Sequence, residues 1–183
     1  KKIKYIVIEP TENSVDIAKP EDFKAANRTF AKALVDNPIS KALGQYGTNV
    51  LVNIINEAGA LPTRNFTTGQ FEGHEAISGE TMYDTIVERE GKPKHNCHAG
   101  CVINCSQLYN DKDKKYKTSG FEYESIWAMG ADCCVENLDH IAEADYIMDD
   151  LGLDTIETSV AFGVAMEAGV LEFGDGEAMC RML

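Results

Sequence analysis

The stretch Asp149-Asp150-Leu151-Gly152-Leu153-Asp154-Thr155 decides how the last third of the chain folds, because it separates two expected helices, 137–150 and 154–168. Gly152 is the residue type that ends a helix in a left-handed conformation, and Asp154 or the residue after it can cap the next helix. The stretch therefore predicts two helices that meet at a sharp corner. Such a corner presents backbone N–H groups and carboxylates, so it can also bind a polar ligand.

Elsewhere the sequence predicts a mainly α fold, with helical layers, a short N-terminal strand and one small β-hairpin. The alternating, β-branched segment Lys2–Ile8 indicates the strand. Residues 107–109 and 116–118 flank Asn110-Asp111-Lys112-Asp113-Lys114 and indicate the hairpin. Apolar spacing and Pro, Ser or Gly at the ends of each pattern predict further helices. These cover residues 21–36, 38–45, 49–57, 78–90 and 122–130.

The composition is that of a folded globular protein, because hydrophobic residues make up 44% and charged residues 26% of the 183. No apolar run approaches the roughly 18–20 residues that span a bilayer, so no membrane partner is expected. The chain starts with Lys1 rather than Met, and no signal-peptide core follows, which predicts a piece of a longer chain. Cysteines that are grouped rather than scattered indicate a reducing compartment, so we expect a cytoplasmic protein.

Charge is distributed unevenly along the chain. Residues 1–118 carry 16 Lys and Arg against 15 Asp and Glu, whereas residues 119–183 carry Arg181 alone against 15 acids. A surface of that sign repels phosphate backbones, which argues against a nucleic-acid partner. The acids are expected partly on solvated helix faces and partly opposite a neighbouring domain that supplies Lys and Arg.

The densest chemical motif is Cys97-His98-Ala99-Gly100-Cys101-Val102-Ile103-Asn104-Cys105. On one continuous helix the outer cysteines would lie about 12 Å apart along the axis, too far for one compact cluster. One gap must therefore be a loop, and Gly100 favours the first, leaving Cys101 and Cys105 one helical turn apart. Three thiolates in such an arc suit an iron–sulfur cube that takes its fourth ligand elsewhere.

Two other interpretations of the cysteines stay open at this point. A structural zinc site would also use thiolates, but it needs four ligands, usually as paired Cys-x2–4-Cys units. Alternatively, the cysteines could pack as small hydrophobic residues, although buried cysteines are seldom grouped. Cys133, Cys134 or Cys180 could supply a fourth ligand, but core packing is the more probable role of the adjacent pair.

A second candidate lies in residues 120–130, where Tyr123 and Glu124 precede the single tryptophan, Trp127. A carboxylate beside aromatic rings can be shielded from water and can act as a general acid or base. Taken alone, Glu124 is more often a surface acid in a first helical turn. Glu122, two residues earlier, is expected on the solvated side.

Together, these motifs resemble the tungsten-pterin aldehyde ferredoxin oxidoreductase family. The likeness covers nearly the whole chain and is specific in combination. Its segments are Tyr46-Gly47-Thr48, Val52-Asn53, Asn56-Glu57-Ala58-Gly59, Leu61-Pro62-Thr63-Arg64-Asn65-Phe66, Phe71-Glu72-Gly73, Ile77-Ser78-Gly79-Glu80, Tyr123-Glu124 and Gly152-Leu153-Asp154-Thr155.

The resemblance implies oxidation of aldehydes to carboxylic acids, with tungsten (or molybdenum) held by two pterins and electrons leaving through a 4Fe-4S cluster to ferredoxin. By position, the cluster ligands are Cys97, Cys101 and Cys105. Glu124 is the acid or base beside the metal, with Tyr123 adjoining it. Asp149, Gly152, Leu153 and Asp154 form the first of two pterin loops.

The same resemblance implies that residues 1–10 end an N-terminal β domain and that residues 11–183 belong to a helical central domain that continues further. The remaining domains would be partners of this one, a homodimer stays open, and the isolated 183 residues should be inactive. One departure is the spacing of the first two cysteines, which family members usually separate by two residues, so Cys97 diverges most. The family's fourth cysteine belongs to the second pterin loop, beyond Leu183.

Two rival functions come from other classes. Radical S-adenosylmethionine enzymes use Cys-x3-Cys-x2-Cys, from which the second spacing here departs by one residue. The alternating strands and helices of their barrel are also missing after Cys105. The non-enzymatic rival is a helical binding module stabilised by zinc.

Overall fold

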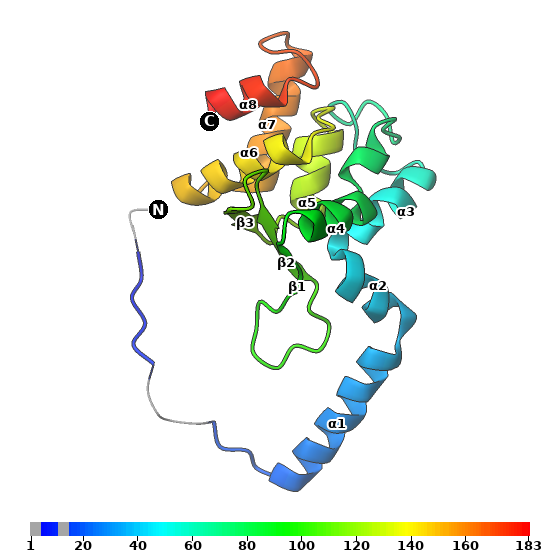
Figure 1. Ribbon diagram of the computed structural model, residues 1–183, viewed down its shortest axis with the longest axis vertical. Coiled ribbons are helices and arrows are strands. Elements are labelled where there is room, and N and C mark those ends of the chain that lie inside the picture. The colour runs from blue at the N-terminus through cyan, green and yellow to red at the C-terminus, as the bar shows by residue number, and fades with distance from the viewer. Residues whose placement is uncertain (1–4, 11–14) are drawn as a thin grey trace.

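The computed structural model describes residues 5–10 and 15–183, which form helices and a small antiparallel sheet (Figure 1). This arrangement confirms the mainly α prediction. The α-helices are α1 (Pro20–Asp36), α2 (Pro38–Tyr46), α3 (Leu51–Glu57), α4 (Gly79–Glu88), α5 (Tyr123–Ile126), α6 (Leu138–Leu151), α7 (Thr155–Glu167) and α8 (Gly176–Met182). Two 3-10 segments, η1 (Thr48–Val50) and η2 (His74–Ile77), precede α3 and α4, and a π-helical segment, η3 (Trp127–Ala131), continues α5.

Local capping explains where most helices begin. An Asn, Ser or Asp side chain accepts the first free backbone N–H groups of five helices, which satisfies donors that have no partner inside the helix. These caps are Asn37 for α2, Ser78 for α4, Asn137 for α6, Asp154 for α7 and Asp175 for α8. Because this chemistry is local, the sequence placed most of these boundaries within two residues, and only α8 was not predicted.

The sheet contains three antiparallel strands in the order β1 (Lys92–His95), β2 (Ser106–Asn110) and β3 (Tyr116–Ser119). The predicted hairpin is β2 and β3, with Tyr109 opposite Thr118. Strand β1 was not predicted, because Lys92-Pro93-Lys94-His95 lacks apolar alternation. It is an edge strand, a position where proline is tolerated.

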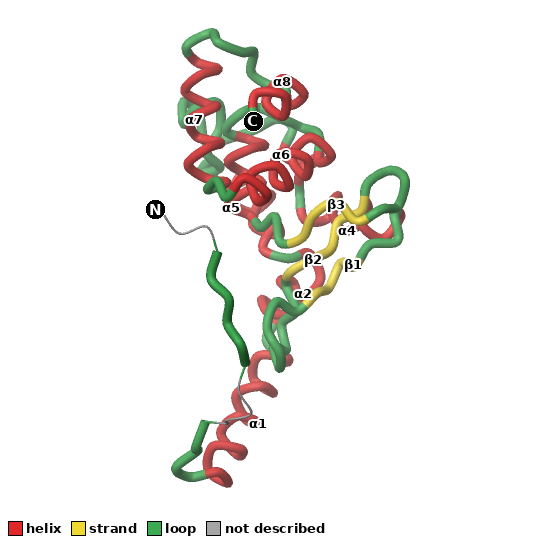
Figure 2. The backbone as a smooth tube through the Cα atoms, turned by 90° about the vertical axis from the view of Figure 1, so that its left-hand side faces the viewer, coloured by secondary structure: helices red, strands yellow, loops and turns green. Residues whose placement is uncertain are grey.

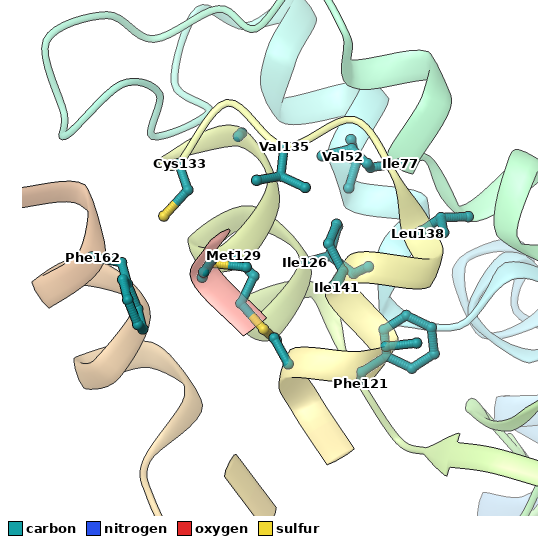
Figure 3. Close-up of a cluster of buried hydrophobic side chains, with 14 of the residues drawn as sticks. Val52, Ile77, Phe121, Ile126, Met129, Cys133, Val135, Leu138, Ile141 and Phe162 are labelled. Carbon is teal, nitrogen blue, oxygen red and sulfur yellow. The ribbon is translucent and has the colours of Figure 1, made fainter. Parts of the chain in front are cut away.

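The core lies where α6, α7 and the α5–η3 segment meet. Ile126, Met129 and Ile141 are fully buried and gather with Phe162 in one interior cluster (Figure 3). Burying such side chains stabilises a fold by about 1.5–3 kcal/mol each. This cluster fixes the position of α5, the helix that carries the candidate catalytic residues.

The α6–α8 end, the sheet and α1 follow one another along the molecule, and α1 projects away from the rest (Figure 2). None of the 17 residues of α1 is buried, and its Phe23 and Phe30 are 56% and 64% exposed. The helix forms as its periodicity predicted. Its apolar face is left uncovered by the described residues.

The expected N-terminal strand is wrong for the residues that can be compared. Lys2–Lys4 lie outside the described residues, and Tyr5–Ile8 form no strand and are highly exposed. Strand propensity reflects packing against neighbouring strands, and no described residue pairs with this segment.

Among the described residues, no helix is both long and apolar enough to cross a membrane.

Candidate functional site

Tyr123 and Glu124 occupy the first turn of α5, as the sequence predicted for a helix in this region. Glu124 is exposed, whereas the next two residues, Ser125 and Ile126, are buried. Among the described residues, aromatic rings therefore do not shield Glu124, and its expected shielding in a complete protein stays a prediction. Helix α5 then passes into π-helical η3, a deviation that is frequent at functional sites.

The corner between α6 and α7 has the predicted structure. Gly152 adopts a left-handed conformation with φ of 68°, and the N–H of Leu153 donates to the carbonyl of Met148 at 2.8 Å. Oδ1 of Asp154 accepts the N–H groups of Ile156 at 3.0 Å and Glu157 at 2.8 Å. The corner is solvent-exposed, and no neighbouring atom lies within 4 Å of the position that a Cβ would take at Gly152. A flat ligand can therefore approach the backbone here.

Helix α5 and the corner are joined by a side-chain hydrogen bond. The hydroxyls of Ser125 and Thr155 lie 3.0 Å apart, and Thr155 directly follows Asp154 at the start of α7. Helices α5 and α7 also pack against each other. The bond thus brings the turn that carries Glu124 beside the corner, although the two are distant in sequence.

The three clustered cysteines lie on the loop between β1 and β2. Gly100 has a φ of 83°, which confirms the predicted turn in the first gap. The second gap contains no helix, so the expectation that Cys101 and Cys105 are one helical turn apart is wrong. Asn104 adopts a left-handed conformation with φ of 56°, which is incompatible with a continuous helix.

The thiols of this loop have different environments. Backbone N–H groups of Asn104 and Ile103 lower the pKa of Cys101, which favours the thiolate form that binds metals. Burial raises the pKa of Cys105, and the charges of Glu122, Cys101 and Cys97 raise it further. The three thiols thus lie within electrostatic reach of one another. Within residues 5–10 and 15–183, however, no three His, Cys, Asp or Glu side chains converge closely enough to hold a metal ion.

The other cysteines are placed elsewhere. Cys133 is fully buried, and its Sγ donates to the carbonyl of Ser159 at 3.4 Å, which confirms core packing for this member of the pair. Sγ of Cys180, on α8, donates to the carbonyl of His140 at 3.3 Å, and burial raises its pKa to about 11. The Cys133 thiol is inaccessible, whereas Cys180 is half-buried.

Thr48 and Glu122 contact the first turn of α5, and the sequence had given neither of them a role in the site. Thr48 donates to Oε2 of Glu122 at 2.6 Å and accepts the N–H of Tyr123 at 2.9 Å. Burial raises the pKa of Glu122, so its expected place on the solvated side is wrong. A signal for both residues existed in Tyr46-Gly47-Thr48 and in the Glu-Tyr-Glu order of 122–124, but no local rule pairs the two segments.

Comparison with known proteins places the chain in a family. Residues 25–183 match the family model described as "Aldehyde ferredoxin oxidoreductase, domains 2 & 3". The chain is 42% identical to the tungsten-containing aldehyde ferredoxin oxidoreductase of Thermococcus kodakarensis and 40% identical to that of Pyrococcus furiosus. Both alignments extend over 168 residues, which is 91% of this chain. The chain spans 27% of the length of each of these relatives. These matches do not favour the radical S-adenosylmethionine and zinc-module interpretations, and the chain belongs to the aldehyde ferredoxin oxidoreductase family.

Proposed function

We propose that this chain is the central part of a tungsten-pterin, iron–sulfur oxidoreductase that converts aldehydes to carboxylic acids and passes the electrons to ferredoxin. The observation that carries the proposal is the position of α5 between the other two motifs. On one side Ser125 and Thr155 join α5 to the corner at Gly152. On the other, Thr48 bonds to the start of α5, and Gly47 lies against the carbonyl of Cys105.

Cys101, Cys105 and Cys97 are the proposed ligands of a 4Fe-4S cluster. Their donor chemistry fits, because all three are free thiols on one loop and the pKa of Cys101 is lowered. The fourth ligand would come from another part of a longer polypeptide. A cluster held here would carry electrons away toward ferredoxin.

Asp149, Gly152, Leu153 and Asp154 are proposed to hold a pterin. The corner fits a flat, polar ring system, because Gly152 leaves open space and the neighbouring carboxylates can accept ring N–H groups. Both helix-capping bonds of Asp154 use Oδ1, so Oδ2 stays available as an acceptor. The tungsten-pterin centre, when bound, would supply the two-electron acceptor for the oxidation.

Glu124 is the proposed general acid or base, and Tyr123 adjoins it. Oxidation of an aldehyde to a carboxylic acid takes its new oxygen from water and releases two protons and two electrons, the electrons going to the proposed metal centre. A base must therefore accept a proton from the attacking water or from the hydrated aldehyde. An exposed carboxylate in the first turn of a helix held by fixed neighbours can do this. Burial raises the pKa of the half-buried Tyr123, and the charge of Glu124 raises it further, which keeps the phenol a hydrogen-bond donor.

The coverage of the relatives supports a multi-domain enzyme. Residues 1–10 are proposed to end an N-terminal β domain, and residues 11–183 to belong to a helical central domain that continues further. Because the proposed active site also needs groups from the other domains, the isolated 183 residues should show no aldehyde oxidation. We place the enzyme in the cytoplasm, where thiolate ligands stay reduced.

The catalytic proposal is tested in the full-length, metal-loaded enzyme with Glu124→Gln. The change keeps size and hydrogen bonding but removes the titrating group, so turnover should fall about 10²–10⁴-fold with tungsten and iron content unchanged. The matched control is Glu88→Gln, an exposed glutamate on α4, which should be near neutral. Full activity of Glu124→Gln would exclude this residue as the acid or base.

The cluster proposal is tested separately by metal analysis. Cys101→Ser and Cys105→Ser should each lower the iron content and bleach the broad visible absorption of the anaerobically purified enzyme. Cys180→Ser, a partly buried thiol on α8, is the control and should retain both. Retention of a full cluster by Cys101→Ser and Cys105→Ser, or tight binding of zinc without colour, would contradict the assignment.

A further inference from the structure

The first turn of α5 is capped by a residue from a distant part of the chain. Glu122 precedes the helix, but its side chain makes no capping bond of its own. The N–H of Tyr123 instead donates to Oγ1 of Thr48 at 2.9 Å, across 75 positions in sequence. The same hydroxyl donates its proton to Oε2 of Glu122 at 2.6 Å. One threonine therefore fixes both the backbone and the preceding side chain of this turn.

Helix α5 needs such external support. It has only four residues before it passes into π-helical η3, and isolated helical turns are unstable because nucleation fixes many dihedrals for few hydrogen bonds. Ser125 and Ile126 are anchored in the core, but Tyr123 and Glu124 lie at the free end of the turn. The bond to Thr48 holds that end directly, and the fully buried Phe121 anchors the chain just before it.

The cap is also connected to the cysteine loop. Gly47, directly before Thr48, has a φ of 66°, and a Cβ there would lie 2.9 Å from the carbonyl oxygen of Cys105. Gly47 thus packs against the loop of Cys105, and the adjacent Thr48 bonds to Glu122 and to the turn of Glu124.

We propose that Thr48 and Glu122 are positioning residues, which hold the Tyr123–Glu124 turn in a fixed orientation relative to the cysteine loop. The inference rests on the proposed role of Glu124 and deepens it. Neither residue needs to touch the substrate. Thr48 acts through the backbone of Tyr123, and Glu122 acts by fixing the rotamer of the Thr48 hydroxyl.

The decisive variant is Thr48→Val in the full-length, metal-loaded enzyme, because valine keeps the shape but loses both hydrogen bonds. We expect kcat to fall about 10–100-fold, as for a small displacement of a catalytic group, with KM changed less than about twofold. Thr48→Ser keeps the hydroxyl and should recover at least about a third of the wild-type kcat. The control is Thr85→Val, a partly buried threonine on α4 whose hydroxyl donates to the carbonyl of Thr81, within its own helix, and it should not change kcat.

A readout independent of turnover is amide hydrogen exchange in the same full-length enzyme. Exchange of the Tyr123 amide should be about tenfold faster in Thr48→Val, and it should return toward the wild-type rate in Thr48→Ser. Tungsten and iron content should match the wild type in both variants. Unchanged exchange at Tyr123, unchanged kcat, or loss of the metals from Thr48→Val would each overturn the positioning role.

A second pair of variants tests the hydrogen bond between Thr48 and Glu122 without altering Thr48. Glu122→Gln keeps an oxygen that can accept the Thr48 proton, so kcat should fall less than about threefold, whereas Glu122→Met removes the acceptor and should resemble Thr48→Val. Equal activity of Glu122→Met and wild type would contradict the inference. If Glu124→Gln keeps the wild-type kcat, the catalytic assignment of Glu124 fails. If Glu124→Gln is inactive and Thr48→Val keeps the wild-type kcat, the positioning inference alone fails.

Discussion

The backbone N–H of Phe66 donates to Oδ1 of Asp132 at 3.0 Å, across 66 positions in sequence. Phe66 is the last of three successive residues with positive φ, Arg64, Asn65 and Phe66, none of which is glycine. The N–H groups of Arg64 and Asn65 donate to the carbonyls of Ala131 and Asp132, at 3.2 Å and 3.0 Å. The end of η3 therefore holds a left-handed turn that L-residues otherwise adopt at a cost of about 1–2 kcal/mol each. The turn also places Phe66 edge-on against Trp127, with ring centroids 5.8 Å apart.

Removing the Asp132 carboxylate should release this turn. The side chain is fully buried, and Oδ2 has no hydrogen-bond partner in the part of the chain that the structure describes. Asp132→Ala should lower the free energy of unfolding by about 1–3 kcal/mol, because the N–H of Phe66 loses its acceptor. Asp132→Asn retains an acceptor oxygen and should cost less than about 1 kcal/mol. Urea denaturation measures both, and equal losses would show that the charge, not the hydrogen bond, holds the turn.

Gly152→Ala separates the backbone role of the corner from its proposed role in pterin binding. An alanine at a φ of 68° is strained, so the free energy of unfolding should fall by about 1 kcal/mol. Gly169→Ala is a matched control after α7, with a φ of 75° and equally open surroundings, and should cost the same. Only Gly152→Ala should also lower the tungsten and pterin content of the full-length enzyme. Equal metal content in the two variants would contradict the pterin assignment.

Two acids on α6 should affect stability in opposite directions as pH changes. Burial alone would raise the pKa of Asp139, but the hydrogen bonds from Arg89 and Tyr109 prevail and lower it. Nη2 of Arg89 lies 3.2 Å from Oδ2 of Asp139, and the Tyr109 hydroxyl donates to Oδ1 at 2.8 Å. Because the folded-state pKa is depressed, this contribution is present above the unfolded-state pKa and is lost as pH falls through the folded-state value.

Asp139→Asn should therefore lower the free energy of unfolding by about 2 kcal/mol at pH 7, and the difference should shrink below about pH 4. The control is Lys112→Gln. Lys112 also pairs with Asp139, but its side chain is 77% exposed, so its loss should cost less than about 0.5 kcal/mol. Denaturation curves at several pH values measure the effect. A constant difference between Asp139→Asn and wild type would rule out the charged pair as its cause.

Asp145 should show the opposite trend. Burial raises its pKa to about 6, the hydrogen bond from Thr118 at 2.6 Å opposes the shift, and the charges of Asp149 and Glu122 add to it. Because the folded-state pKa is raised, this group's contribution is fully present below the unfolded-state value and is lost as pH rises through about 6. Asp145→Asn should therefore be more stable than wild type by about 2 kcal/mol at pH 7 and equal to it near pH 4.

The control for this change is Asp150→Asn, an exposed acid on the same helix, which should alter neither the stability nor its pH dependence. Destabilisation of Asp145→Asn at pH 7 would mean that the charged form of Asp145 is favoured in the folded protein. In that case the buried carboxylate is stabilised by a partner outside the residues described here.

The sequence by itself determined the features that depend on neighbouring residues. The corner at Gly152 and the start of α7 at Asp154 could be predicted because a left-handed glycine and an Asp cap act within one helical turn. The spacing of Cys97, Cys101 and Cys105 likewise indicated a loop through Gly100. The conformation of the second gap could not be predicted, because this loop packs against a segment distant in sequence, where Gly44 of α2 lies against the carbonyl of Ile103.

The tertiary structure decided the contacts between distant segments. No local pattern could reveal that Thr48 caps the helix of Glu124, that Glu122 is half-buried, or that Asp132 holds the turn at Phe66. The bonds from Thr48 to Glu122, from Tyr123 to Thr48 and from Phe66 to Asp132 each join residues more than 60 positions apart. Such contacts depend on the packing of α5 and η3 into the core. Helix caps are local chemistry and can be read along the chain, whereas the orientation of the candidate catalytic turn depends on packing between segments that are distant in sequence.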